Sequence, residues 1–141
     1  MILYLDTSSL VKLYVEEANS GETRLLAQTA EVIATSRIAY VEAHAALARK
    51  RRDHGLTRAQ YRSVIQELDQ DWDSYFVVDV SQSLVQVAGS FAERHSLRAL
   101  DAIHLASAVA LRDRAARAVA FHCFDARLTS AARDEGLQIH E

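Results

Sequence analysis

Five short apolar runs recur along the chain, separated by longer segments in which apolar residues have helical spacing. The runs are residues 2–5, 32–34, 76–80, 119–124 and 137–140. They mostly lack the alternation of polar and apolar residues that a strand with one solvated face shows, so we expect strands that are buried on both faces. Strands of this kind joined by crossover helices predict an α/β fold with a mainly parallel sheet covered on both sides.

The segments between the runs predict one or two helices after the first strand, two after the second, two after the third and one after the fourth. In the segment after the second strand, the spacing of Val41, Ala45 and Ala48 predicts a shared packing face. Gly55 and Gly136 stand where helices are expected to end. In parallel sheets functional groups gather at the carboxyl ends of the strands, so we expect functional residues at those positions.

Length and composition favour one soluble domain over residues 1–141. Half of the residues are apolar and a quarter are charged, as in an ordinary globular protein. The single Cys excludes an internal disulfide framework and fits a reducing compartment. No apolar run approaches the roughly 18–20 residues that span a bilayer, and the start has no basic segment typical of a signal peptide. We therefore expect a cytoplasmic protein with no membrane partner.

Two acidic residues directly follow predicted strands. Asp6 ends the first strand and Asp125 ends the fourth, so both are expected at the same edge of the sheet. An Asp between a strand and a helix is also an ordinary N-cap. That interpretation stays open for both acids. For Asp6, however, Ser8 and Ser9 are able to cap the first helix in its place and would leave it available for another role.

Two further acids lie early in apolar helical segments. Glu42 follows the second strand, and Asp101 is surrounded by small and apolar residues. An ionised carboxylate in such surroundings is costly unless a cation or hydrogen-bond donors compensate its charge. The structural alternatives are a pair with Arg37 or Arg49 for Glu42. For Asp101 they are a helix N-terminus or a pair with Arg98.

Taken together, the four carboxylates suggest one site. A cluster of unpaired carboxylates repels itself and raises its own pKa values, and the usual remedy is a hard divalent cation with oxygen ligands, Mg²⁺ or Mn²⁺. Such an ion lowers the pKa of a water molecule and stabilises the charge that gathers on a phosphodiester. The pattern therefore points to nuclease chemistry.

The same residues carry a resemblance to a known family. The segment LYLDTSSLVKLY at 3–14, the helix of Glu42, LDAIHLA at 100–106 and FDARL at 124–128 resemble a PIN-domain ribonuclease. More specifically, they resemble the VapC-type toxins of bacterial toxin–antitoxin pairs, over essentially the whole chain. The resemblance implies a PIN-like three-layer α/β/α sandwich whose five-stranded sheet has the strand order 3-2-1-4-5.

The resemblance also implies a mechanism and partners. Asp6 and Asp101 would contact Mg²⁺ or Mn²⁺ most directly, with Glu42 and Asp125 supporting the ion and Ser8 supporting the first acid. These residues would form the catalytic site of an endoribonuclease that hydrolyses RNA phosphodiesters with a metal-activated water. The family further implies a cognate VapB-like antitoxin and a homodimer.

The densest positive run is Arg49, Lys50, Arg51 and Arg52, which ends the helix of Glu42. Cations are favoured at a helix C-terminus, and an RNA backbone contact is the alternative function. His104, three residues after Asp101, is within reach of a phosphate, although such a residue more often packs the helix or supports a ligand. The formal charge of −3 first argues against nucleic-acid binding, but without the four site acids the remainder carries +1.

Two other functions fit the acids less well. A haloacid-dehalogenase-like phosphotransferase would use Asp6 as its nucleophile, but such enzymes usually carry a second Asp where this chain has Ser8. A non-catalytic PIN-like binding module would act through protein contacts alone. Acids at all four positions argue against that loss of function.

Overall fold

The computed structural model describes residues 1–140, so the last residue of the predicted domain 1–141 lies outside the described part. This part contains a five-stranded sheet of order β3-β2-β1-β4-β5 in which all neighbouring strands are parallel. The strands are β1 Ile2–Leu5, β2 Val32–Ser36, β3 Phe76–Val78, β4 Val119–His122 and β5 Gln138–Ile139. The strand order and direction predicted from the sequence are confirmed.

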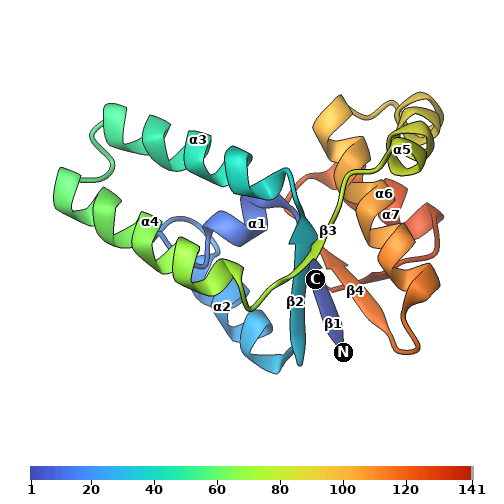
Figure 1. Ribbon diagram of the computed structural model, residues 1–141, viewed down its shortest axis with the longest axis horizontal. Helices are drawn as coiled ribbons and strands as arrows, with labels where there is room; N and C mark the ends of the chain where they lie inside the picture. Colours follow the sequence, from blue (N-terminus) through green and yellow to red (C-terminus); the bar gives the residue numbers. More distant parts are fainter. Residues whose placement is uncertain (141) are drawn as a thin grey trace.

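Helices cover both faces of this sheet, as predicted. They are α1 Thr7–Val11, α2 Ser20–Thr29, α3 Ala39–Arg52, α4 Arg58–Trp72, α5 Gln82–His95, α6 Ala99–Arg114 and α7 Ala126–Asp134. Figure 1 shows α1 to α4 on one side of the sheet and α5 to α7 on the other, which is the expected three-layer arrangement. Among the described residues, no helix is long and apolar enough to cross a membrane.

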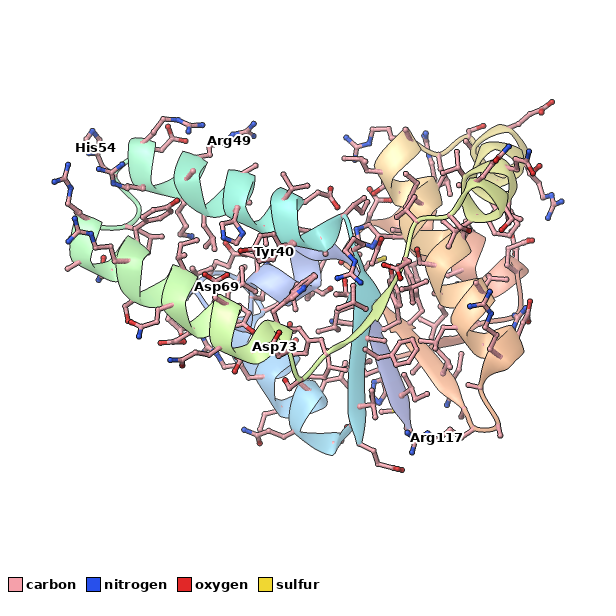
Figure 2. All side chains as sticks on the ribbon, viewed as in Figure 1. Tyr40, Arg49, His54, Asp69, Asp73 and Arg117 are labelled. Carbon is pink, nitrogen blue, oxygen red and sulfur yellow. The ribbon has the colours of Figure 1, made fainter. Side chains whose placement is uncertain are left out.

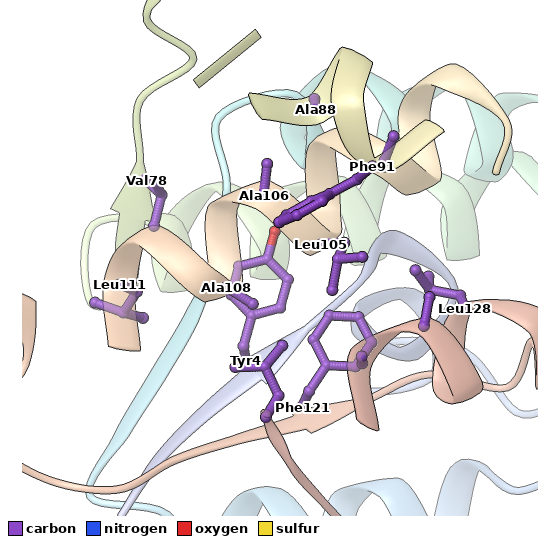
Figure 3. Packing of buried hydrophobic residues seen from close by; sticks show 14 of the residues in the cluster. Tyr4, Val78, Ala88, Phe91, Leu105, Ala106, Ala108, Leu111, Phe121 and Leu128 are labelled. Carbon is purple, nitrogen blue, oxygen red and sulfur yellow. The ribbon is translucent and has the colours of Figure 1, made fainter. Parts of the chain in front are cut away.

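The central strand β1 supplies both cores because its side chains alternate between the two faces. Leu3 and Leu5 pack with Leu10 on the side of α1. Tyr4 points to the other side and stacks on Phe121, with ring centroids 5.5 Å apart and the planes inclined by 8°. Figure 3 shows both rings lying under α6. All four residues of β1 are buried, so the position of the residue that follows the strand is tightly fixed.

Helices α3 and α4 form a hairpin that extends away from the sheet in Figure 1, and its small core also includes Val11 of α1 and Val15. The predicted packing face of α3 is wrong, because Val41 is 64% exposed and Ala45 is also exposed. Its buried residues are Ala39, Ala43 and Leu47. Both sets have helical spacing in a helix rich in Ala, so periodicity alone did not choose between them.

Two chain reversals show different uses of glycine. Gly136 follows α7 with φ of +82°, the left-handed conformation expected of a glycine after a helix. After α3 the left-handed residue is instead His54, with φ of +64°. Gly55 is needed there for space, because a Cβ atom at this position would lie 2.9 Å from Cγ of Lys50.

The corrected face of α3 gives a stability prediction. Leu47→Ala should lower the free energy of unfolding by about 2–5 kcal/mol, because it opens a cavity in the core of the hairpin. Val41→Ala should change it by no more than about 0.5 kcal/mol, because the side chain is exposed. Urea denaturation followed by circular dichroism measures both values, and equal losses would show that Val41 is a packing residue after all.

Candidate active site

Asp6 directly follows β1 and is 6% exposed. Its carboxylate accepts hydrogen bonds from the backbone N–H of Ser9 at 3.0 Å and from the hydroxyl of Ser8 at 2.9 and 3.0 Å. Asp6 is therefore itself the N-cap of α1, and the expectation that Ser8 and Ser9 would cap this helix in its place is wrong. Ser8 instead donates to the acid.

The charge of Asp6 is only partly compensated. Burial raises the pKa of this carboxyl, and the charge of His104 and the donors on Ser9 and Ser8 offset only part of the effect. Within residues 1–140, no Lys or Arg side chain forms an ion pair with Asp6. A buried carboxylate without a cationic partner is a position that favours binding of a cation.

Glu42, in the first turn of α3, turns inward instead of forming the surface pair considered from the sequence. Its Oε1 accepts from the hydroxyl of Thr7 at 2.7 Å and lies 2.9 Å from Nε2 of His104. Arg37 pairs with Asp79 instead. Burial alone would raise the pKa of Glu42, but the hydrogen bonds from His104 and Thr7 and the charge of His104 outweigh it and lower the pKa.

His104 joins several elements inside the protein. Its Nδ1 lies 2.8 Å from the Tyr4 hydroxyl, and its Nε2 lies 3.0 Å from the Thr7 hydroxyl as well as near Glu42. The residue is 2% exposed. Its ring therefore supports the carboxylate of Glu42, and the alternative of a direct phosphate contact does not fit a side chain closed off from solvent.

Asp101 and Asp125 lie together on the other side of the site. Arg98 lies between them, with its Nε 3.5 Å from Asp101 and its Nη2 3.9 Å from Asp125. Asp125 caps α7 by accepting from the N–H of Leu128 at 2.9 Å. The three side chains line a cleft of about 340 Å³ together with Arg127. Both structural alternatives, the cap and the pair with Arg98, are thus present.

The four acids are of the chemical type that binds a hard divalent metal ion. All four offer carboxylate oxygens, which Mg²⁺ and Mn²⁺ prefer, and the buried charge of Asp6 calls for a cation. Among residues 1–140, no three Asp, Glu, His or Cys side chains already stand close enough to hold an ion together. Glu42 faces one cleft, and Asp101 and Asp125 face another.

Comparison with models of protein families and with known proteins identifies the family of this chain. The model of the PIN domain family matches residues 3–134. The chain belongs to the PIN domain family. It is also 32% identical over 142 residues to ribonuclease VapC49 of Mycobacterium tuberculosis, covering 98% of this chain and 94% of that protein. Ribonuclease VapC47 of the same species is 32% identical over 139 residues, covering 96% and 93% of the two chains.

Solved structures agree with this PIN fold. VapC20 of Mycobacterium tuberculosis, described as a toxin that cleaves the sarcin–ricin loop, superposes with a TM-score of 0.66 at 22% identity, covering 92% of this chain and 94% of that one. VapBC2 of Rickettsia felis, solved with a promoter DNA fragment, gives 0.63 at 18% identity and covers 99% and 98%. At these identities the likeness concerns the fold alone.

The sequence interpretation missed Thr7 as a site residue and left the role of His104 open. Thr7 adjoins Asp6, so its place in the motif was a usable signal. Nothing in the sequence indicated that its hydroxyl would donate to Glu42, 35 residues further along the chain. That contact depends on how α3 docks against α1.

The pKa of Asp6 gives a test of its burial. A raised pKa in the folded state means that the protonated carboxyl is favoured by folding, and this stability is lost as the pH rises through the folded-state pKa. Without divalent cations at pH 7, Asp6→Asn should therefore raise the midpoint of thermal unfolding, by roughly 2–5 °C. The gain should vanish below pH 3.8, the value for an unperturbed Asp.

Adding Mn²⁺ supplies the control for this measurement. The ion should raise the unfolding midpoint of the wild type and have little effect on Asp6→Asn, because a ligand stabilises only the state that binds it. A variant less stable than the wild type at pH 7 would contradict the account of an uncompensated buried charge.

Proposed function

We propose that this PIN domain, spanning residues 1–141, is a metal-dependent endoribonuclease and the toxin of a type II toxin–antitoxin pair. The observation that carries the proposal is the buried carboxylate of Asp6, which directly follows the central strand and, among residues 1–140, forms no ion pair with a Lys or Arg. Near full-length relatives that are named ribonucleases support the choice of substrate.

The four acids are proposed to contribute to ion binding in two different ways. Asp6 and Asp101 are proposed as its direct ligands, with Glu42 and Asp125 holding it from farther out or through its waters. When bound, Mg²⁺ or Mn²⁺ supplies Lewis acidity, which lowers the pKa of a water molecule and offsets negative charge on the phosphodiester. Arg98 makes only long ion pairs with Asp101 and Asp125, at 3.5 and 3.9 Å, and its side chain is 85% exposed, so an ion would displace it at little cost.

Hydrogen-bond donors of the protein orient the carboxylates of Asp6 and Glu42. The hydroxyl of Ser8 and the N–H of Ser9 fix the plane of Asp6. Thr7 and His104 hold one oxygen of Glu42 and leave its other oxygen available. Because these donors already orient both carboxylates, the rearrangement that ion binding requires falls on Asp101, Asp125 and Arg98.

The proposed partners are supported by a further structure with the same fold. A toxin–antitoxin complex from Klebsiella pneumoniae shares the fold, with a TM-score of 0.60 at 18% identity over 84% of this chain and 83% of that one. We extend this to a VapB-like antitoxin and a homodimer for the present chain. RNA is proposed to be held locally, at the ion and at the basic end of α3 formed by Arg49, Lys50, Arg51 and Arg52.

Substitution of the acids tests the activity. Asp101→Asn and Glu42→Gln should each reduce metal-dependent cleavage of RNA at least about 100-fold, because each removes a charge that holds or supports the ion. Asp113→Asn is the matched control, since this exposed acid lies at the other end of the same helix α6. Cleavage is followed on gels with Mn²⁺ and with a chelator.

Other outcomes would point to the alternative functions. Full cleavage by both variants, with circular dichroism showing native folding, would contradict the proposal. A phosphoryl adduct on Asp6 detected by mass spectrometry would revive the phosphotransferase. Absence of Mn²⁺ binding in calorimetry would favour a non-catalytic binding module.

A further inference from the structure

Two lysines from different helices share one carboxylate beside the site. Nζ of Lys12 lies 3.0 Å from Oε1 of Glu17, and Nζ of Lys50 lies 3.2 Å from Oε2 of the same residue. The side chains of Lys12 and Lys50 are only 12% and 27% exposed. The two ammonium groups therefore form a cradle for one anion, which Glu17 fills in the free protein.

The position of this cradle is set by the fold and not by Glu17 alone. Lys12 ends α1, and its Nζ also lies 4.8 Å from the centroid of the Phe124 ring, which holds the amine from a second side. Lys50 projects from the last turn of α3. Burial alone would raise the pKa of Glu17, but the hydrogen bonds and charges of both lysines outweigh it and lower the pKa, so the position favours an anion.

Through Glu17 and Lys50, the cradle opens into the cleft that Glu42 also lines, whereas Lys12 lies behind Glu17 and does not line this cleft. One cleft of about 610 Å³ is lined by Thr7, Ser8, Val11, Glu17, Glu42, Ala46, Arg49, Lys50, Asp53 and Gly55. Glu42 and Lys50 stand eight residues apart on α3, so they are separated by roughly 12 Å along the helix axis. The two backbone positions are more than two helical turns apart, which leaves room along the cleft for a phosphate at Lys50 in addition to one at the acids.

The four basic residues at the end of α3 do not all face the same cleft. Lys50 and Arg49 line the cleft. Arg51 lies over the ring of Tyr61 on α4, and Arg52 is exposed. Figure 2 shows Arg49 on α3 and His54 in the turn beyond it, toward the end of the hairpin farthest from the sheet. Only part of the positive run therefore faces the acids.

We propose that Lys12 and Lys50 form a subsite for an RNA phosphate other than the one that is cleaved, and that Glu17 is the internal anion which this phosphate displaces. The inference rests on the proposed function, because it takes RNA as the molecule that enters the cleft. A carboxylate-rich segment of a partner protein presents similar charges. The shared cleft favours RNA, since a strand held at Lys50 continues directly to Thr7, Ser8 and Glu42.

Glu17 is suited to being displaced. The carboxylate is 32% exposed in its pairs with both lysines, and partly exposed ion pairs contribute little to stability. It lies in the irregular segment between α1 and α2, so its withdrawal disrupts no helix. Glu17 thus lowers the affinity for RNA while keeping the two lysines in place.

Binding of a 20-nucleotide single-stranded RNA to the full chain, measured by fluorescence anisotropy in a chelator, tests the subsite without cleavage. Glu17→Gln should bind the RNA about two- to five-fold more tightly. Glu16→Gln is the matched control, because it removes the same charge one residue away, where Glu16 pairs with Arg24 and is 79% exposed. It should change the affinity much less.

Replacing a lysine of the cradle should have the opposite effect on RNA affinity. Lys50→Gln should weaken binding and reduce the salt dependence of the affinity by about one phosphate contact. Arg52→Gln, two residues further along the same helix, should weaken it less. Equal effects of these two variants, or equal effects of Glu17→Gln and Glu16→Gln, would overturn the subsite and leave only a diffuse basic surface.

Two further readings separate this inference from the proposed function. If Glu17→Gln strengthens binding of a poly-glutamate peptide and not of RNA, the cradle serves an acidic protein partner and the inference is wrong. If the wild type cleaves RNA but the variants do not differ from their controls in RNA affinity, the proposed subsite is wrong and the proposed ribonuclease function is unaffected. If the wild type neither binds nor cleaves RNA, the proposed function fails first.

Discussion

The buried imidazole of His104 connects the elements on which the site depends. It contacts Tyr4 of β1, Thr7 of α1 and Glu42 of α3 while belonging to α6. A buried polar ring without these partners would be costly, and each partner would in turn lose a hydrogen bond. The network therefore fixes how the α3–α4 hairpin docks against the sheet, and with it the distance of Glu42 from Asp6.

Two of the acids proposed to hold the ion also have a structural role. Asp6 and Asp125 each follow a parallel strand, and each caps the helix that comes next. A cap uses the N–H groups of the first turn, which also place partial positive charge beside the carboxylate. Capping is thus compatible with metal binding and does not replace it. It also holds these two carboxylates at one edge of the sheet, where the proposed ion would bind.

Parts of this arrangement could be predicted from the sequence because they depend on local patterns. Uninterrupted apolar runs indicate buried parallel strands, and the resemblance to PIN-domain ribonucleases supplied their order. Other parts depend on how elements dock. The predicted packing face of α3 was wrong because apolar residues have helical spacing on two faces of this Ala-rich helix. The contacts of Glu42 with Thr7 and His104, and the anion cradle around Glu17, join residues far apart in the chain, where no spacing rule applies.

The central claim is that the carboxylates at the edge of the sheet act on RNA with a divalent cation. Its most direct test is to map the new RNA ends in total bacterial RNA after incubation with the purified protein, with Mn²⁺ or with a chelator. The account predicts a small set of defined cuts that require the ion and are missing with Asp6→Asn. The same cuts in the presence of the chelator, or with Asp6→Asn, would contradict it.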